Sequence, residues 1–564
     1  MPTRATLLPA KEESVDFEKT RNLFIEGDNL EVLKLLYKPY FGKVKMIYID
    51  PPYNTGSDLV YVDNYADPLD AYLKMTDQVD DSGNLMTTNP ETSGRYHSTW
   101  LSMMYPRFYL ARQLLRDDGV IFVSIDDHEV HSLRLMMNEL FGEENFVAQL
   151  IWNSKRGGGG GVKTVVSEHE YVMVYAKQNQ PEALGKQLVE AEPLDMHDEK
   201  GPFRKGRELN KWGAGSARAD RPTMFFPIPG PNGEDVFPIR NDGTEGRWRL
   251  GKKAMLRIVE AGDALFEKRS DGTYIVYQKI RTTEPRYKPY RTILPLEVGT
   301  SADGTASLKE LFDGKCPFDF TKPPSLLKHL LSVAGVEDED LVVDFFAGSC
   351  PLAQAVFEYC RDEGISLRTI LVQLPEPTQR KTMNGKIEES IAFTMGFRNI
   401  AEVGKERIRR VIAKMKKEQA SRLDQDKLVE DLSFRVFKLA RSNYKLWKGV
   451  KDKTPEAYAT EMETHIDSLV DGWKRENVIY EVMLKEGFGL TSKIEPEKYR
   501  DNEIWRVTDL DKGQSFLICL DDEISTSTIR HLELAKNDLF VCRDIALDDT
   551  GAANLALQCN LKTI

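Results

Sequence analysis

Several features that define large classes of proteins are missing from this sequence. None of its six cysteines lies in a Cys-x-x-Cys pair, which argues against a zinc site or a disulfide framework and is typical of a reducing cytoplasm. No apolar run approaches the roughly 20 residues of a membrane span. The polar start of the chain leads us to expect no secretory signal. We therefore expect a cytoplasmic protein with no membrane contact and no structural metal.

The charges are distributed unevenly along the chain. The net charge is −12 at pH 7, yet residues 204–291 carry 19 Lys and Arg against 11 Asp and Glu, a local charge of +8 that leaves −20 elsewhere. Basic residues are interleaved with aromatic ones there, which suits contacts with nucleic-acid phosphates and some bases. A solvated surface is the alternative, and the charge count alone does not separate the two. The candidate contacts are Arg247, Arg249, Arg286 and Lys288.

At 564 residues the chain is too long for one hydrophobic core. Apolar strands alternate with amphipathic helices in two stretches, and an irregular segment rich in Pro, Gly and Arg separates them. We predict an α/β core in two halves, 1–177 and 315–417. An insert at 178–314 interrupts this core, and a mixed α+β domain at 418–564 follows it.

The stretch from Met46 to Gly56 organises the predicted core. Its apolar start predicts a buried parallel strand, and Pro51 and Pro52 end that strand because proline cannot donate to a sheet ladder. The following loop offers the Asp50 carboxylate, the Pro51 carbonyl and the Tyr53 ring at the carboxyl end of a strand, where open α/β sheets bind ligands. Two acceptors and a ring suit a flat base with an exocyclic amine. A proline-rich turn without a function is the alternative.

Two further turns follow predicted strands. The strand at Leu341–Val343 leads into Asp344-Phe-Phe-Ala-Gly-Ser-Cys350, a turn of small residues, and then into a helix near Pro351. A helix N-terminus and backbone amides suit a carboxylate group of a ligand. Glu376, after the next strand, suits ribose hydroxyls, as in dinucleotide-binding folds. Asp28, after the first strand, is either a plain helix N-cap or a contact beside the same ligand.

These stretches and their order resemble the permuted β-group of DNA adenine methyltransferases. More narrowly, they are similar to the modification (Mod) subunits of Type III restriction–modification systems. The Asp-Pro-Pro-Tyr loop comes first, the basic insert next and the small-residue turn last. The matching stretches span most of the chain outside the insert and are Phe24-Ile-Glu-Gly-Asp-Asn29, Tyr48-Ile-Asp-Pro-Pro-Tyr-Asn-Thr-Gly56, Val120-Ile-Phe-Val-Ser-Ile-Asp-Asp127, Phe141-Gly-Glu-Glu-Asn-Phe146, Asp344-Phe-Phe-Ala-Gly-Ser349, Val372-Gln-Leu-Pro-Glu-Pro377, and Arg435-Val-Phe-Lys-Leu439 through Trp447.

The resemblance implies a Rossmann-like core that binds S-adenosylmethionine and is interrupted by a target-recognition domain. It implies methylation of adenine N6 in duplex DNA, on a base flipped out of the helix, with no metal ion. It also implies a homodimer and a separate restriction subunit with helicase and nuclease activity. This chain has neither a Walker motif nor nuclease carboxylates, so we expect it to be the methylating partner in a prokaryotic cytoplasm.

The family's functional residues map onto matching positions of this chain. The resemblance implies Asp50, Pro51, Pro52 and Tyr53 as the catalytic loop. Lys155 and Arg156, ahead of five consecutive glycines in a predicted hairpin loop, join the basic residues of the insert as candidate DNA contacts. The predicted cofactor contacts are Asp28, Asn29, Lys322, Asp344, Phe346, Ala347, Gly348, Ser349, Cys350 and Glu376.

One departure from the family pattern bears on activity. The turn usually reads Phe-x-Gly-Ser/Thr-Gly, but here Cys350 takes the place of the last glycine. A Cβ and a sulfur are expected to crowd the ligand and to disfavour a positive φ, so we expect weakened cofactor binding. Three alternatives remain: methylation of cytosine N4, methylation of RNA, and a non-catalytic DNA-recognition subunit with an impaired cofactor site. Asp rather than Ser before Pro-Pro-Tyr favours adenine over cytosine.

Overall fold

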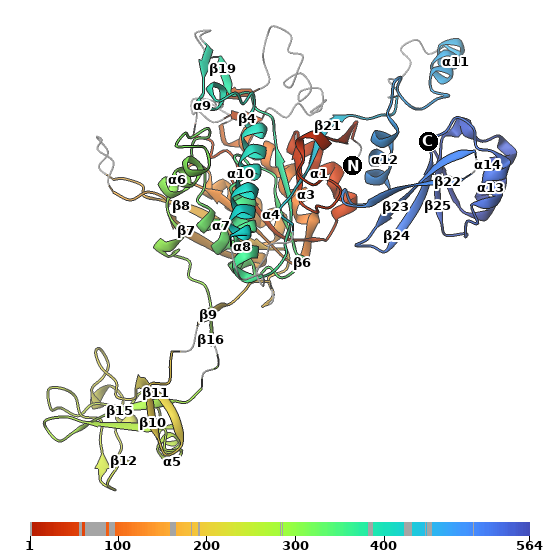
Figure 1. Ribbon diagram of the computed structural model, residues 1–564. Helices are drawn as coiled ribbons and strands as arrows, with labels where there is room; N and C mark the ends of the chain where they lie inside the picture. The colour runs from red at the N-terminus through yellow and green to blue at the C-terminus, as the bar shows by residue number, and fades with distance from the viewer. Residues whose placement is uncertain are drawn as a thin grey trace. The chain divides into compact units, whose positions relative to one another are not determined.

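The fold is described from a computed structural model of the chain (Figure 1). The first of its two compact units joins Met1–Gly185 to Arg291–Ile564, and the second is Lys186–Tyr290. No helix in the described part of the chain combines the length and apolar content needed to cross a bilayer. The structure describes residues 3–55, 59–61, 86–88, 96–157, 165–181, 183–189, 192–282, 284, 286–381, 387–421, 431–445, 447, 454–499 and 501–564.

A nine-stranded sheet forms the centre of the first unit. Its inner strands, from β21 to β6, run parallel. The edge strand β1 is antiparallel to β21, and β8 is antiparallel to both β6 and the edge strand β7. The predicted α/β fold class is confirmed, because apolar runs such as Met46–Ile49 are fully buried in this sheet. In spatial order the strands are β1 (Ala5–Pro9), β21 (Arg435–Arg441), β2 (Leu23–Glu26), β18 (Arg368–Gln373), β17 (Leu341–Asp344), β3 (Val44–Ile49), β6 (Leu115–Ile125), β8 (His169–Ala176) and β7 (Phe146–Asn153).

Helices cover both faces of this sheet, as Figure 1 shows. On one face lie α1 (Asn29–Tyr40), α3 (Tyr96–Leu114) and α4 (Val130–Phe141), which share a core with the sheet. On the other lie α7 (Pro324–Ala334), α8 (Pro351–Glu363) and α10 (Ile400–Ala420), with α6 (Ser301–Leu311) against α10. Helices α1, α3, α8 and α10 lie in the crossover connections that join parallel strands of the sheet.

The C-terminal segment contributes to two sheets. β21, which the sequence pattern assigned to a domain at 418–564, lies in the central sheet between β1 and β2. The chain from Asn502 to Cys519 forms two strands around a turn at Gly513, where φ is +62°. A separate five-stranded sheet contains β22 (Lys493–Tyr499), β23 (Asn502–Asp509), β24 (Gln514–Cys519), β25 (Leu539–Cys542) and β26 (Asn560–Thr563). The helices α13 (Thr526–His531) and α14 (Asp549–Gln558) share a core with this sheet, whereas α12 (Arg475–Glu486) packs against α1 and β1. The remaining helix of the segment is α11 (Pro455–Thr464).

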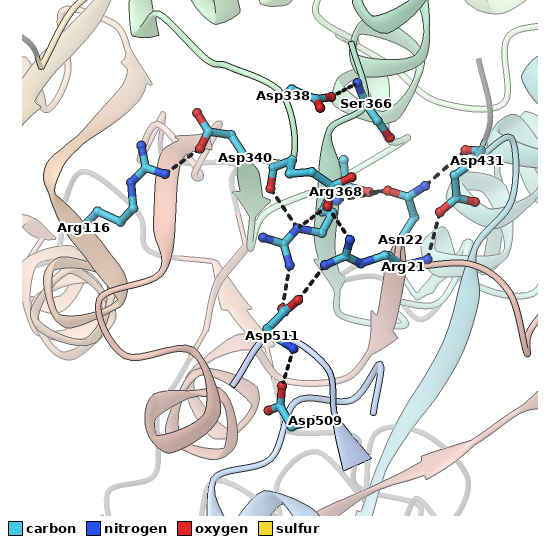
Figure 2. A network of polar contacts seen from close by, with 12 residues as sticks. Arg21, Asn22, Arg116, Asp338, Asp340, Ser366, Arg368, Asp431, Asp509 and Asp511 are labelled. Atoms are coloured by element: carbon cyan, nitrogen blue, oxygen red, sulfur yellow. Dashed lines mark hydrogen bonds and ion pairs between the residues drawn. The ribbon is translucent and has the colours of Figure 1, made fainter. Parts of the chain in front are cut away.

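A polar network ties the β23–β24 turn to the central sheet (Figure 2). Asp511, in the turn, accepts from Arg21 at 2.7 Å and from Arg368 at 2.6 Å. These arginines lie at the amino ends of β2 and β18. The network therefore lies at the edge of the sheet opposite the predicted ligand loops. Its partly exposed ion pairs are individually weak, but together they fix the orientation of the turn.

The second unit is built around a small antiparallel sheet. The sheet contains β10 (Met196–Asp198), β11 (Gly201–Glu208), β15 (Tyr274–Ile280) and β14 (Ala264–Lys268), and α5 (Lys252–Glu260) completes a core centred on Trp248. Residues 178–185 and 291–314, which the sequence pattern assigned to the insert, lie in the first unit. The chain enters and leaves the second unit through an antiparallel pair, β9 (Gln187–Val189) and β16 (Arg286–Lys288). Two short strands of the second unit are β12 (Ile228–Pro229) and β13 (Asp235–Val236). The short elements of the first unit are β4 (Leu59–Tyr61), β5 (Met86–Thr88), β19 (Gln379–Lys381), β20 (Ile387–Glu389) and α9 (Ile391–Thr394).

Candidate active site

The predicted site loops follow four neighbouring parallel strands, β2, β18, β17 and β3. Their carboxyl ends lie at the same edge of the sheet, because the strands pair in parallel register. Open α/β sheets bind ligands at this edge. In strand order, the loops carry Asp28 and Asn29, then Glu376, then Asp344 and the turn through Cys350, and finally Asp50 to Tyr53.

Asp50 belongs to a compact polar cluster. The Tyr53 hydroxyl donates to Asp50 Oδ1 at 2.8 Å, and Lys322 Nζ lies 3.0 Å from the same oxygen. Lys322 Nζ also donates to the Tyr53 hydroxyl at 2.7 Å. Glu170, on β8, brings Oε2 to 3.3 Å from Lys322 Nζ and 3.2 Å from the Tyr53 hydroxyl. The ring of Trp152 lies 5.5 Å from the same ammonium group, so two carboxylates and two aromatic rings surround one cation.

Burial controls the protonation of this cluster. Burial raises the pKa of Asp50, although Lys322 acts to lower it. Burial acts to lower the pKa of Lys322, but Asp50 and Glu170 outweigh it and raise that pKa. Burial and the same two acids hold the pKa of Tyr53 well above its usual value. Lys322 therefore stays charged and Tyr53 stays neutral at neutral pH.

The Asp50 loop is anchored on its far side by α3 and α4. Trp100 Nε1, in α3, donates to the Pro52 carbonyl at 2.8 Å. Asn54 has a φ of +61° and donates through Nδ2 to Glu129 Oε1 at 2.6 Å, at the start of α4. These bonds occupy the Pro52 carbonyl and fix a strained backbone at Asn54. The loop is therefore held in place before any ligand arrives.

The turn after β17 differs from the expected amide cradle. The Phe346 amide donates to Asp344 Oδ1 at 2.9 Å, the Gly348 amide to Gln373 Oε1 at 2.6 Å and the Cys350 amide to the Ala347 carbonyl at 2.7 Å. Three amides of the turn are thus already bonded within the protein. Burial raises the pKa of Asp344 well above its usual value.

Cys350 adopts the left-handed conformation that glycine favours, with φ at +59°. Its side chain is fully buried. A Cβ built on Gly404 of α10 would lie 2.8 Å from Cys350 Sγ, so the sulfur fills the space that this glycine leaves. The sequence predicted that the sulfur would crowd the ligand. In the structure it packs against α10.

Two buried arginines that the sequence did not single out support the predicted cofactor contacts. Arg107 of α3 donates through Nε to Asn29 Oδ1 at 2.6 Å, and Asn29 donates through Nδ2 to the Phe345 carbonyl at 2.7 Å. Arg407 of α10 donates to Ser349 Oγ at 3.0 Å, and burial lowers its pKa to about 10. The charged residues of these two helices have the sequence pattern of exposed helix positions. The sequence therefore did not indicate that these two arginines are buried.

The predicted basic residues are divided between the two units. Lys155 and Arg156 are exposed and follow β7, whose end lies at the same sheet edge as Asp50. In the second unit, Arg247 donates to the Gly215 carbonyl at 2.5 Å and Arg249 donates to the Asn210 carbonyl at 3.2 Å. Arg286 and Lys288 are exposed on β16, and the glycines at 158–161 lie outside the described residues.

The chain is similar in sequence to known proteins. A family model described as DNA methylase matches residues 44–362. The Mod subunit of the Type III restriction–modification enzyme EcoPI, from Escherichia phage P1, is 34% identical over 420 residues, which cover 70% of this chain and 63% of the relative. The StyLTI Mod subunit of Salmonella typhimurium is 33% identical, over 75% of this chain and 61% of its own length.

A third relative is covered more fully. The EcoP15I Mod subunit of Escherichia coli is 31% identical over 489 residues, which cover 79% of this chain and 71% of the relative. The chain spans about three fifths of the length of the first two relatives. With a family match over more than half of its residues, the chain belongs to the DNA methylase family and, within it, to the Mod subunits of Type III restriction–modification enzymes.

Proposed function

We propose that this protein is a site-specific DNA methyltransferase that transfers a methyl group from S-adenosylmethionine to N6 of adenine in duplex DNA. The observation that carries this proposal is the arrangement of the Asp50 loop beside the turn at Asp344–Cys350, on adjacent strands of a parallel sheet. We propose that it works in a prokaryotic cytoplasm as the modification and DNA-recognition subunit of a Type III system. A separate restriction subunit is the proposed partner.

The residues along the sheet edge fit the proposed cofactor. Gly348 has a φ of +53°, and a Cβ there would lie 3.2 Å from the Phe318 ring. A residue with a side chain would therefore be strained at this position and would fill the space between the turn and that ring. We assign cofactor contacts to Asp28, Asn29, Asp344, the turn and Glu376, with Lys322 at the boundary to the Asp50 loop. S-adenosylmethionine supplies, when bound, an electrophilic methyl group on a sulfonium.

The chain's own residues act on the target amine. In the proposal, Asp50 and the Pro51 carbonyl accept the two N–H groups of adenine N6, which favours a pyramidal nitrogen and exposes its lone pair. The Asp50 carboxylate also stabilises the positive charge that grows on the nitrogen as the new bond forms. The Tyr53 ring stacks on the flipped base and excludes water. Most of the rate gain comes from positioning and electrostatics.

Replacement of Asp50 tests this proposal. Asp50→Asn keeps the shape of the side chain but removes the negative charge, so we expect DNA binding and cofactor binding to persist while methylation falls by about 10²- to 10³-fold. Transfer of labelled methyl groups to mixed-sequence DNA measures the rate, and calorimetry measures cofactor binding. Methylation by Asp50→Asn at the wild-type rate would show that this role is wrong.

Two alternatives are separated by direct measurements. Nucleoside analysis of methylated DNA distinguishes N6-methyladenine from N4-methylcytosine. The positive φ at Cys350 favours an impaired cofactor site as the second alternative. Calorimetry with wild type and Cys350→Gly decides it, because binding by the variant alone would indicate a subunit that recognises DNA without catalysing methylation.

We assign DNA recognition to the second unit. Beside the predicted residues, Lys252, Lys253 and Arg257 of α5 are exposed, and no ion pair joins them to any residue that the structure describes. Unpaired cations suit phosphate contacts. We also propose that the protein is a homodimer, and sedimentation of the purified chain tests this.

A further inference from the structure

Two partly buried acids compete for the same donors beside the Asp50 loop. Asp50 Oδ1 and Glu170 Oε2 both lie within 3.3 Å of Lys322 Nζ. Both also lie within 3.2 Å of the Tyr53 hydroxyl. The lysine side chain is 7% exposed, and the Glu170 side chain is 16% exposed. The Lys322 ammonium is therefore shielded from solvent, whereas the Asp50 side chain, 26% exposed, remains open to a ligand.

The number of protons limits the arrangements that this group can adopt. The ammonium of Lys322 has three N–H donors, which are matched by Asp50, Glu170 and the Tyr53 oxygen. The Tyr53 hydroxyl has only one proton, and Asp50 is its nearer acceptor at 2.8 Å, against 3.2 Å for Glu170. In this arrangement Asp50 Oδ1 already accepts two hydrogen bonds, so Oδ2 is the oxygen left for a target amine while Lys322 and Tyr53 hold Oδ1 and draw negative charge from the carboxylate.

Release of Asp50 requires another acceptor for the same two donors. A buried ammonium that loses its carboxylate partner without a replacement is strongly destabilised. Glu170 is placed to be that replacement, because it contacts both donors and comes from a different strand, β8. Lys322 and Tyr53 can thus turn toward Glu170 while Asp50 turns to the substrate.

We propose that Glu170 is a positioning residue for methyl transfer. It accepts hydrogen bonds from Lys322 and the Tyr53 hydroxyl while Asp50 accepts a hydrogen bond from the target amine. This inference rests on the proposed function and adds a role that the Asp-Pro-Pro-Tyr loop does not contain. Glu170 acts through Lys322 and Tyr53 rather than on the reacting atoms. Without it, the ammonium remains paired to Asp50 Oδ1 and weakens the negative charge that the carboxylate offers to the target amine.

The first test compares Glu170→Gln, Glu170→Asp and a control, Glu143→Gln, which removes an exposed carboxylate at the surface. Glu170→Gln keeps the shape but loses the charge, so we expect kcat for methylation to fall by about 10- to 100-fold, as for a misplaced reacting group. The Kd for S-adenosylmethionine and the Tm should change little. Glu170→Asp should recover part of kcat, and Glu143→Gln should match wild type.

The pH profile gives a readout that a purely structural role would not move. The titratable groups that face Asp50 are Lys322, Glu170, Tyr53, Tyr48 and Asp344. Of these, Glu170 acts to raise the pKa of Asp50, because two negative charges disfavour one another. Methylation requires ionised Asp50, so kcat/KM falls as pH drops through its pKa. Glu170→Gln should therefore move this acid limb to lower pH, and Glu170→Asp should leave it near the wild-type position.

The outcomes separate the inference from the function on which it rests. If wild type does not methylate DNA, the proposed function fails. If wild type methylates and Glu170→Gln has the same kcat and the same acid limb, the function stands and the inference is wrong. A loss of kcat that is fully explained by a lower Tm or by weaker cofactor binding also overturns it. If Glu170→Gln does not fold, the decision passes to Glu170→Asp, and a folded Glu170→Asp variant with no loss of kcat contradicts the inference.

Discussion

Cys350 and Gly404 form a matched pair at the turn after β17. The backbone at Cys350 is left-handed, which costs a residue with a Cβ of the order of 1 kcal/mol. The buried sulfur lies against Gly404 of α10, which offers a surface without a side chain. The two positions are therefore coupled: the helix can approach the turn only because one of the two side chains is absent.

A double-mutant cycle tests this coupling. A Cβ on Gly404 would lie 2.8 Å from Cys350 Sγ and 3.2 Å from the Gly348 carbonyl oxygen, so Gly404→Ala must displace the turn. We expect it to destabilise the protein by about 1–3 kcal/mol and to weaken cofactor binding. Adding Cys350→Gly removes the sulfur and should restore part of both losses. Urea unfolding and calorimetry measure them, and strictly additive effects would argue against the coupling.

Arg107 supports the predicted cofactor contacts from beneath. It is fully buried and donates to Asn29 Oδ1 and the Met103 carbonyl. Arg107→Met removes the donor to Asn29 Oδ1 and the ion pair with Asp28, 3.5 Å away, so we expect a loss of stability of about 1–3 kcal/mol and a raised Kd for S-adenosylmethionine. Thermal unfolding and calorimetry measure the two effects. Arg112→Met, in the same helix, is the matched control, because Arg112 Nε has no partner among the described residues. Equal effects of both substitutions would contradict the role of Arg107.

The sequence predicted the residues whose signals are local. Asp50 and Tyr53 were found because a strand, two prolines and an aromatic residue follow one another, and the turn at Asp344–Cys350 has a similar strand-to-helix pattern. Glu170 and Arg107 were missed because their partners are distant in the chain: Glu170 meets Tyr53 across 117 positions. The only local sign of Glu170 is an acid at the start of an apolar strand. Tertiary pairing of this kind leaves no periodic pattern to read.

The same distinction applies to whole elements. Strands β3 and β17 were predicted because they are apolar runs bounded by turns. β21 has the same pattern, but the sequence placed it in a C-terminal domain, because nothing local indicates that Leu23 pairs with Arg435. The amide cradle expected at the start of α8 was predicted from helix geometry alone. Helix geometry does not indicate that the Gln373 side chain accepts a hydrogen bond from the Gly348 amide.

The basic face of α5 makes a prediction at the scale of an element. Lys252, Lys253 and Arg257 are exposed on a helix with no acid in its first turn. Replacing all three by Gln should weaken DNA binding uniformly across sequences and reduce the slope of log Kd against log salt by about 1 for each phosphate that is no longer neutralised. Binding titrations at several salt concentrations measure this slope, and calorimetry should show unchanged cofactor binding. Gln at the exposed Lys19, Lys493 and Lys536 of the first unit provides the charge-matched control. An unchanged slope for the α5 variant would exclude the helix from the DNA interface.

At the scale of the whole molecule, the core is assembled from distant parts of the chain. β17 and β18 lie between β2 and β3, although the second unit separates these two pairs in sequence. The fold of the first unit therefore requires both of its segments, Met1–Gly185 and Arg291–Ile564. The second unit has its own hydrophobic core around Trp248. A division of this kind allows recognition and catalysis to be removed separately.

Excision of the second unit tests this division. Val189 and Arg286 are register partners in the β9–β16 pair, so an Asn-Gly turn can join them and close a hairpin in place of residues 190–285. The central sheet keeps all its strands, so we expect the shortened protein to fold and to bind S-adenosylmethionine within a few-fold of wild type. It should lose sequence-specific DNA binding and methylation. Calorimetry, circular dichroism and methyl transfer check these outcomes. A folded product that no longer binds the cofactor would show that the second unit helps to form the cofactor site, and sequence-specific methylation by the shortened protein would place recognition in the first unit.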